Sequence, residues 1–164
     1  MMAESLAVVP GSFDPITLGH RDVIERTTGL FDQVIVGVAD NHAKQALFSL
    51  EERLELIEEC VAGLENVRAA AIRGLLAEFC RQVGATVIVK GLRGGQDLGH
   101  EEPMALVNKE LTGVETIFLA AAPAWGHVSS SIVKDVAKHG GDVSSYVSPG
   151  VRVALLRQLG RSVQ

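Results

Sequence analysis

Short apolar runs alternate along the chain with segments in which apolar residues recur at helical spacing. The runs cover residues 6–9, 34–39, 67–72, 87–90 and 116–121, and most are rich in β-branched side chains. Runs of this kind are typical of buried strands in a parallel sheet. The sequence therefore predicts five strands separated by helices.

Apolar faces and capping residues predict the helices. One face consists of Val23, Ile24, Thr27, Leu30 and Phe31, in a helix from about residue 19 to residue 30. A second face consists of Leu50, Leu54, Ile57 and Val61. Ser49 and Glu52 form a capping box before it. Further helices are predicted over residues 75–82, 97–111 and 130–139.

A last helix is predicted after Ser148, with Pro149 at its first position. Strands that alternate with helices favour right-handed crossovers and an α/β fold. We expect a single doubly wound, Rossmann-like five-stranded parallel sheet with helices on both faces. No repeat or linker divides the sequence, so residues 1–164 are expected to form a single domain.

Composition and charge narrow the class of protein. The 164 residues are 47% hydrophobic and only 4% aromatic, which suits a core of aliphatic strands and helices. The net charge of -5 argues against a nucleic-acid partner, because such proteins usually present a basic face. Cys60 and Cys80 show no metal-ligand spacing and are interpreted as reduced core thiols.

The long uncharged run between Glu115 and Lys134 is not interpreted as a membrane span. It contains Pro123, Trp125, Gly126, His127 and three successive serines, which would be costly in lipid. No basic segment leads into an apolar one at the start of the sequence. We expect a soluble, cytoplasmic protein with no membrane partner.

Three segments carry candidate chemistry, and the first follows the first strand. Gly11 and Gly19 shape a turn with two hydroxyl residues, and His20 falls in the first turn of the next helix. A helix N-terminus attracts anions, and an imidazole there can donate a hydrogen bond to a phosphate oxygen. These features converge at the carboxyl end of a strand, where α/β sheets bind ligands.

The second segment is Lys90-Gly91-Leu92-Arg93-Gly94-Gly95, which places two cations beside three glycines after the fourth strand. It matches neither a Walker A loop nor a dinucleotide-binding motif. The third segment is Val128-Ser129-Ser130-Ser131-Ile132-Val133-Lys134, at the predicted start of a helix. One serine is expected as an N-cap, and the others could hold a di- or triphosphate.

Together these segments resemble the nucleotidyltransferase superfamily. Its hallmarks are an HxGH-type or TxGH-type motif after the first strand, here Thr17-Leu18-Gly19-His20, and a serine-rich motif before a late helix. Within it the chain is similar to the phosphopantetheine adenylyltransferase family, from about residue 6 to residue 159. The matching positions are the stretch from Pro10 to His20, Lys44 before residues 48–53, residues 90–93, Asp97, Glu101, Asn108 and residues 141–143.

The resemblance implies a single nucleotidyltransferase domain that transfers the adenylyl group of ATP to 4'-phosphopantetheine. The products would be dephospho-coenzyme A and pyrophosphate, in coenzyme A biosynthesis, with Mg²⁺ carried on ATP. In-line attack by the acceptor phosphate would need neither a base nor a covalent intermediate. The resemblance also implies a homohexamer, and it leaves feedback binding of coenzyme A as an open question.

The resemblance assigns roles to particular residues. His20 would be catalytic and stabilise the transition state at the α-phosphate. The substrate-binding residues would be Ser12, Lys44, Leu76 and Lys90. The ATP-binding residues would be Ser12, Phe13, His20, Gly91, Leu92, Arg93, Glu101, Trp125, Gly126, His127, Val128, Ser129, Ser130 and Ser131.

Some positions depart from the family pattern. Asn41-His42 replaces an Asn-Pro or Ser-Pro pair, and Leu98, Gly99 and His100 replace residues of a segment rich in aromatics. His127 stands where an aromatic is common, and Pro103 is expected to interrupt the helix over residues 97–111.

Two alternatives remain. The chain could act on another acceptor, such as nicotinamide mononucleotide, or be a non-catalytic ATP-binding sensor. A class I aminoacyl-tRNA synthetase shares the histidine loop, but this chain has no room for a tRNA-binding domain.

Overall fold

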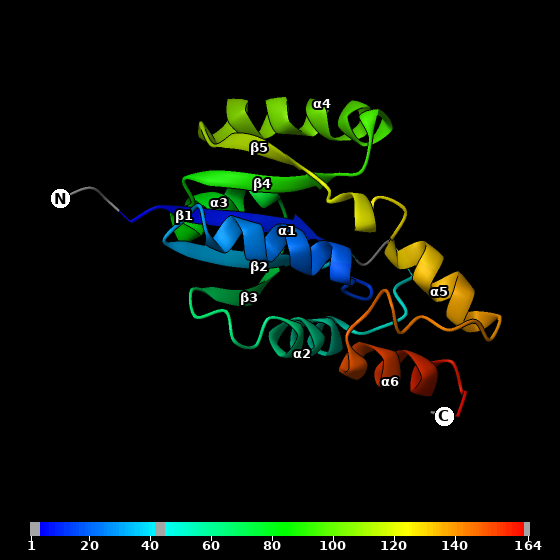
Figure 1. Ribbon diagram of the computed structural model, residues 1–164. Helices are drawn as coiled ribbons and strands as arrows, with labels where there is room; N and C mark the ends of the chain where they lie inside the picture. Colours follow the sequence, from blue (N-terminus) through cyan, green and yellow to red (C-terminus); the bar gives the residue numbers. More distant parts are fainter. Residues whose placement is uncertain (1–3, 42–44, 163–164) are drawn as a thin grey trace.

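The computed structural model, which describes residues 4–41 and 45–162, contains one five-stranded sheet (Figure 1). Every neighbouring pair is parallel, in the order β3-β2-β1-β4-β5. The strands are β1 (Leu6–Gly11), β2 (Gln33–Ala39), β3 (Val67–Ile72), β4 (Val87–Leu92) and β5 (Glu115–Ala120). The predicted α/β class and parallel sheet are confirmed.

Helices follow all five strands. They are α1 (Leu18–Thr28), α2 (Leu50–Cys60), α3 (Leu76–Val83), α4 (Gly95–Thr112), the short 3-10 helix η1 (Pro123–Trp125), α5 (Ser130–Lys138) and α6 (Pro149–Gln158). The predicted capping box of Ser49 and Glu52 is present, and Pro149 is the first residue of α6 after Ser148. No helix in the described ranges is both long and apolar enough to cross a bilayer.

Two local predictions were wrong. Leu30 does not belong to the buried face of α1, because the helix ends at Thr28 and Gly29 caps it, which leaves Leu30 62% exposed. Pro103 does not interrupt α4, which continues through it to Thr112. The proline ring would crowd the carbonyl of Gly99 one turn earlier, and a glycine backbone can adjust to relieve that contact.

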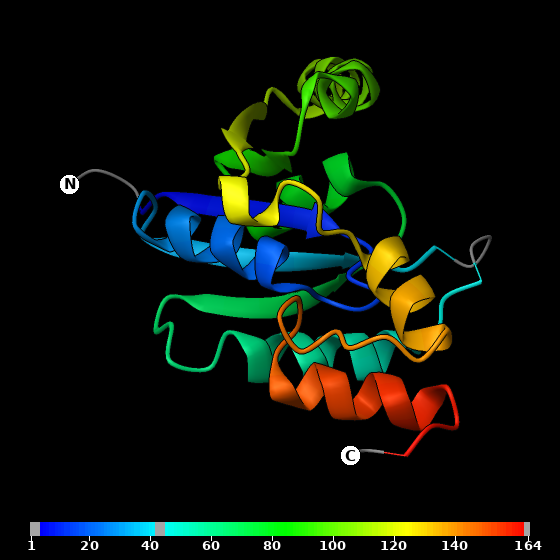
Figure 2. The ribbon, with the colours of Figure 1, turned by 45° about the vertical axis from the view of Figure 1, so that its right-hand side comes forward.

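Alternating strand residues build two cores on opposite faces of the sheet. Val9, Val36 and Val89 face α1 and α2 on one side, and α5 and α6 extend that core. Val8 and Ile35 face α3 on the other side, where Phe79 and Cys80 pack against them. Figures 1 and 2 show α1 and α3 on opposite sides of the sheet.

Both cysteines are buried and free, as predicted. Burial raises the pKa of the Cys80 thiol to about 11, so this thiol stays protonated near neutral pH.

The sheet opens between β1 and β4. These strands pair only at Ala7 with Val87 and at Val8 with Ile88, whereas β1 pairs with β2 along its whole length. The strand order also reverses here, because β2 and β3 extend to one side of β1 and β4 and β5 to the other. Such a switch point is where open α/β sheets bind ligands, and α5 stands beyond this end of the sheet (Figure 1).

Candidate active site

A cavity of about 500 Å³ lies at the switch point, between the carboxyl ends of β1 and β4. The loop after β1, the start of α1, the first turns of α4 and the start of α5 contribute to its wall. Twelve of the predicted site residues line it: Ser12, Phe13, His20, Lys90, Gly91, Arg93, Glu101, Trp125, Val128, Ser129, Ser130 and Ser131. All three candidate segments therefore meet at one cavity.

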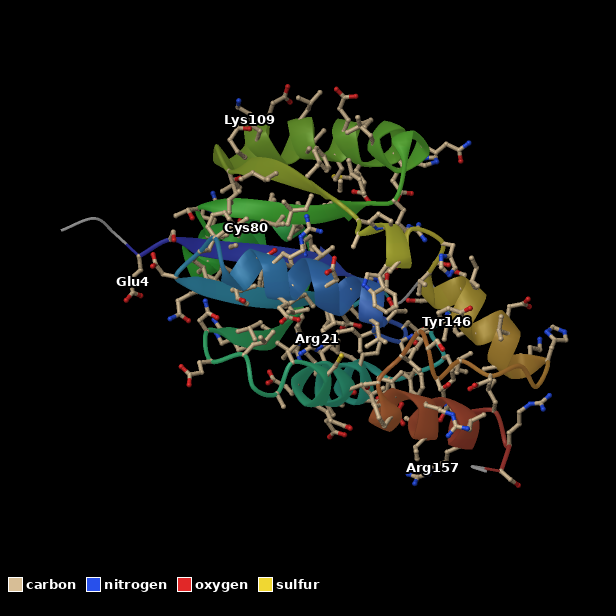
Figure 3. The ribbon with its side chains drawn as sticks, viewed as in Figure 1. Glu4, Arg21, Cys80, Lys109, Tyr146 and Arg157 are labelled. Atoms are coloured by element: carbon tan, nitrogen blue, oxygen red, sulfur yellow. The ribbon has the colours of Figure 1, made fainter. Side chains whose placement is uncertain are left out.

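Four predicted residues lie outside this lining. Leu92 ends β4 beside the cavity, and Leu76 begins α3 and packs against the core of the opposite face. Gly126 and His127 follow η1, and the His127 ring packs edge-on against Tyr146, with ring centroids 5.8 Å apart. Figure 3 labels Tyr146, in the segment between α5 and α6. Lys44 lies outside the described residues.

His20 is held by the residue that starts α1. Thr17 is the N-cap, and its Oγ1 accepts the backbone N–H of His20 at 3.2 Å. In return, the backbone N–H of Thr17 donates to Nδ1 of the imidazole at 3.0 Å. Because Nδ1 is an acceptor in this bond, the ring proton of the neutral imidazole is on Nε2. The arrangement leaves Nε2–H as a hydrogen-bond donor for a ligand in the cavity.

His20 is also kept neutral by its surroundings. Burial, with a smaller contribution from the positive charge of Arg93, lowers the pKa of His20 from its ordinary value of 6.5 to about 4. The ring packs edge-on against Phe13, with centroids 5.1 Å apart. At neutral pH the side chain is therefore suited to donate a hydrogen bond from Nε2.

This lowered pKa predicts a specific loss of stability in acid. Between pH 6.5 and pH 4 the unfolded chain protonates His20 and the folded chain does not, so unfolding becomes more favourable as the pH falls. The effect has an upper limit of about 3 kcal/mol. Urea unfolding at a series of pH values should show the unaltered protein losing stability relative to His20→Gln over this window. Parallel losses in both proteins would contradict the assignment.

The two cations of the β4 loop are each paired with a carboxylate of α4. Lys90 Nζ donates to Glu101 Oε2, and both side chains line the cavity. The Arg93 backbone N–H donates to Asp97 Oδ2 at 2.9 Å, and its guanidinium forms an ion pair with the same oxygen. The hydrogen bond from the Arg93 backbone is the main cause that keeps the pKa of Asp97 below its ordinary value.

The serines at the start of α5 have different partners. Ser129 is the N-cap, and its Oγ accepts the N–H of Ile132 at 3.2 Å. Ser130 Oγ donates to the carbonyl of Pro15 at 2.7 Å and so joins α5 to the loop after β1. Ser131 is exposed at the mouth of the cavity. The N-terminus of α5 therefore faces the cavity with hydroxyls and free N–H groups, which suits a phosphate chain.

Close backbone approaches shape the wall at two glycines. A Cβ at Gly91 would lie 2.8 Å from Cγ2 of Val23, so glycine lets α1 pack closely against β4. A Cβ at Gly19 would lie 3.2 Å from Cβ of Trp125, which packs beside the start of α1.

Three residues of this region were absent from the predicted site. Thr17 orients His20, and the position of a threonine just before a helical pattern is a local signal that could have identified it as a cap. Asp97 lines the cavity, as the acidic partner of Arg93. Asp14 is buried beside the cavity, and its partners are too distant in sequence for any local pattern to indicate them.

A family model identifies the class of protein as a nucleotidyltransferase. The model of the cytidylyltransferase-like family matches residues 8–136. A nicotinic acid mononucleotide adenylyltransferase from Plasmodium falciparum, solved with NaAD, has the same fold, with a TM-score of 0.71 at 13% identity over 99% of this chain and 100% of that one.

Sequence relatives define the family more closely. The chain is 51% identical to a phosphopantetheine adenylyltransferase from Nocardioides sp. over 93% of this chain and 96% of the relative. It is 53% identical to one from Renibacterium salmoninarum over 88% and 91%, and 47% identical to one from Acidovorax sp. over 98% of both. The chain belongs to the phosphopantetheine adenylyltransferase family of enzymes.

Proposed function

We propose that this protein transfers the adenylyl group of ATP to 4'-phosphopantetheine, giving dephospho-coenzyme A and pyrophosphate in coenzyme A biosynthesis. Relatives named phosphopantetheine adenylyltransferase are similar over nearly the whole chain, and they support 4'-phosphopantetheine as the acceptor. The observation that carries the chemistry is the neutral imidazole of His20, held by Thr17 in the same cavity as the start of α5.

The proposed reaction is an in-line displacement. An oxygen of the acceptor phosphate attacks the α-phosphorus of ATP, and the bond to the β-phosphate oxygen breaks to release pyrophosphate. The acceptor is already an anionic nucleophile, so catalysis depends on positioning and on stabilising charge. His20 would donate from Nε2–H to an α-phosphate oxygen in the transition state, where such a donor is most effective.

The two substrates are proposed to bind to different parts of the cavity wall. Ser131, Arg93 and the N-terminus of α5 are suited to the triphosphate, since together they offer a hydroxyl, a cation and backbone N–H groups. Ser12 and Lys90 lie on the wall proposed for the acceptor. Lys44 is predicted to contact the same phosphate.

Mg²⁺ is proposed to arrive with ATP as part of the substrate. No group of three His, Cys, Asp or Glu side chains gathers as a metal site within the described ranges. In this proposal the phosphates of the nucleotide hold the ion, since Mg²⁺ commonly binds substrate phosphates and water with few protein ligands.

The proposed acceptor is tested by direct assay. With ATP and Mg²⁺, 4'-phosphopantetheine should yield dephospho-coenzyme A and pyrophosphate, and nicotinamide mononucleotide or nicotinic acid mononucleotide should yield no pyrophosphate above background. Preference for a mononucleotide would show that the proposed acceptor is wrong and that the enzyme acts on a mononucleotide. Binding of ATP without turnover of any acceptor would identify a nucleotide sensor.

Self-assembly is proposed through exposed apolar side chains of α4 and β5. They are Leu98, Met104, Leu106, Val107, Leu111 and Ile117, which are 39–58% exposed. Large apolar side chains left exposed in number suggest a contact surface. We propose a homo-oligomer, a hexamer by resemblance to the family, and the mass of the protein in solution tests this. A cytoplasmic location and competition of coenzyme A for the cavity are further parts of the proposal.

A further inference from the structure

The carboxylate of Asp14 joins three segments that border the active-site cavity. Asp14 lies in the loop after β1, and only 7% of its surface is exposed. Oδ1 accepts the backbone N–H of Phe48, and Oδ2 accepts that of Leu47, both at 2.9 Å. Oδ2 also accepts from Nζ of Lys134 on α5, at 2.9 Å. One carboxylate therefore connects the β1 loop to the approach to α2 and to α5.

A smaller cavity of about 200 Å³ lies beside this carboxylate. Ser12, Ser130 and Ser131 line both this cavity and the larger one, so the two cavities adjoin. Asp14 and Lys134 line only the smaller of the two. Asp14 thus stands directly behind the wall of the active site.

The charge of Asp14 is retained despite its burial. Burial by itself would raise the pKa of Asp14, but the N–H of Leu47, the ammonium of Lys134 and the N–H of Phe48 outweigh it. The pKa therefore lies below its ordinary value. Lys134 is the last residue of the serine-rich segment. Its ammonium binds the Asp14 carboxylate, and the residue does not line the larger cavity.

The loop that Asp14 holds carries strain beside the catalytic histidine. Phe13, the preceding residue, has a φ of 47°, which is uncommon for a bulky side chain, and its ring packs against His20. Such a conformation persists only where the surroundings hold it. The bonds of Asp14 and the bond from Ser130 to Pro15 hold the residues that follow.

We propose that Asp14 is a positioning residue for adenylyl transfer. Through Lys134, Leu47 and Phe48 it sets the position of the β1 loop relative to the serine-rich start of α5. It touches no reacting atom. The inference rests on the proposed function, because it concerns the alignment of the acceptor with ATP. Misplacement by about 1 Å can lower a rate on the order of 100-fold.

The test compares Asp14→Asn with the unaltered protein. An amide of the same shape lacks the charge and turns an N–H₂ group towards existing donors. We expect kcat to fall on the order of 100-fold while the dissociation constant of ATP, measured by calorimetry, changes little. Asp32→Asn is the matched control, because Asp32 also accepts a backbone N–H and a hydroxyl of one residue, Ser5, far from the cavity. It should keep full activity.

Lys134 supplies a second, milder pair of variants should Asp14→Asn fail to fold. Lys134→Met removes one partner of Asp14 and should lower kcat on the order of 10-fold. Lys134→Arg retains the positive charge and should keep most of the kcat of the unaltered protein. Unchanged kcat in both Asp14→Asn and Lys134→Met would overturn the inference. A loss of ATP affinity equal to the loss of kcat would also overturn it. Inactivity of the unaltered protein would instead overturn the proposed function, and this inference with it.

Discussion

Replacement of His20 by alanine is expected to lower kcat on the order of 100-fold or more, by analogy with the loss of one transition-state donor. The affinity for ATP should remain nearly unchanged. In the proposed mechanism, Nε2–H of His20 would donate to charge that develops only during transfer, and the start of α5, Arg93 and Ser131 would still bind the phosphates of ATP. Steady-state kinetics with both substrates, together with ATP calorimetry, measure the two quantities separately.

Two further variants separate catalysis from folding at this position. His20→Ala also removes the capping bond from Thr17, so part of its effect could reflect a frayed helix start. Glutamine at this position keeps a capping box, so His20→Gln should recover stability and only part of the activity. His139→Ala alters an exposed histidine at the far end of α5 and should leave kcat unchanged. Turnover by His20→Ala close to that of the unaltered protein would remove His20 from the mechanism.

Replacement of Lys90 by methionine is expected to raise the Michaelis constant for 4'-phosphopantetheine on the order of 30-fold or more. The variant loses a cation from the cavity wall and leaves the Glu101 carboxylate facing two anionic substrates without its partner. In the proposed site the lost attraction acts on the acceptor phosphate, whereas the repulsion from Glu101 is shared by both substrates. The Michaelis constant for ATP should change much less, and initial rates over a grid of both substrates measure the difference.

Charge-retaining and remote variants provide the controls for Lys90. Lys90→Arg keeps the positive charge and the carboxylate pair and should stay within a few-fold of the unaltered protein. Lys109→Met breaks a similar pair with Glu115 at the other end of α4, where both side chains are exposed, and should have no effect on either constant (Figure 3). If the Michaelis constant for ATP rose more than that for the acceptor, Lys90 would belong to the nucleotide side.

Local signals accounted for most of the fold. Strand runs and caps such as Ser49 with Glu52 depend on neighbours within a few residues, and the structure contains them. The predictions for Leu30 and Pro103 were wrong because helical periodicity and proline geometry each gave only part of the local picture. A glycine cap ended α1 one residue before Leu30, and α4 continues through Pro103, four residues after a glycine.

The sequence by itself also determined which segments would meet. The carboxyl ends of parallel strands share one edge of the sheet, so a glycine loop after β1, a basic loop after β4 and serines before α5 converge there. It indicated that His20 would lie at a helix start. It did not indicate the protonation or the tautomer of that side chain.

Only the tertiary structure decided the protonation and the hydrogen-bond partners of the side chains at that edge. The pKa of His20 depends on burial by several segments and on Arg93, and the bond from Thr17 selects its tautomer. The role of Asp14 depends on Leu47 and Lys134, which lie 33 and 120 residues away along the chain. Patterns of neighbouring residues specify helices, strands and the edge where loops gather. Protonation and hydrogen-bond partners follow from desolvation and from contacts that exist only once the chain has packed.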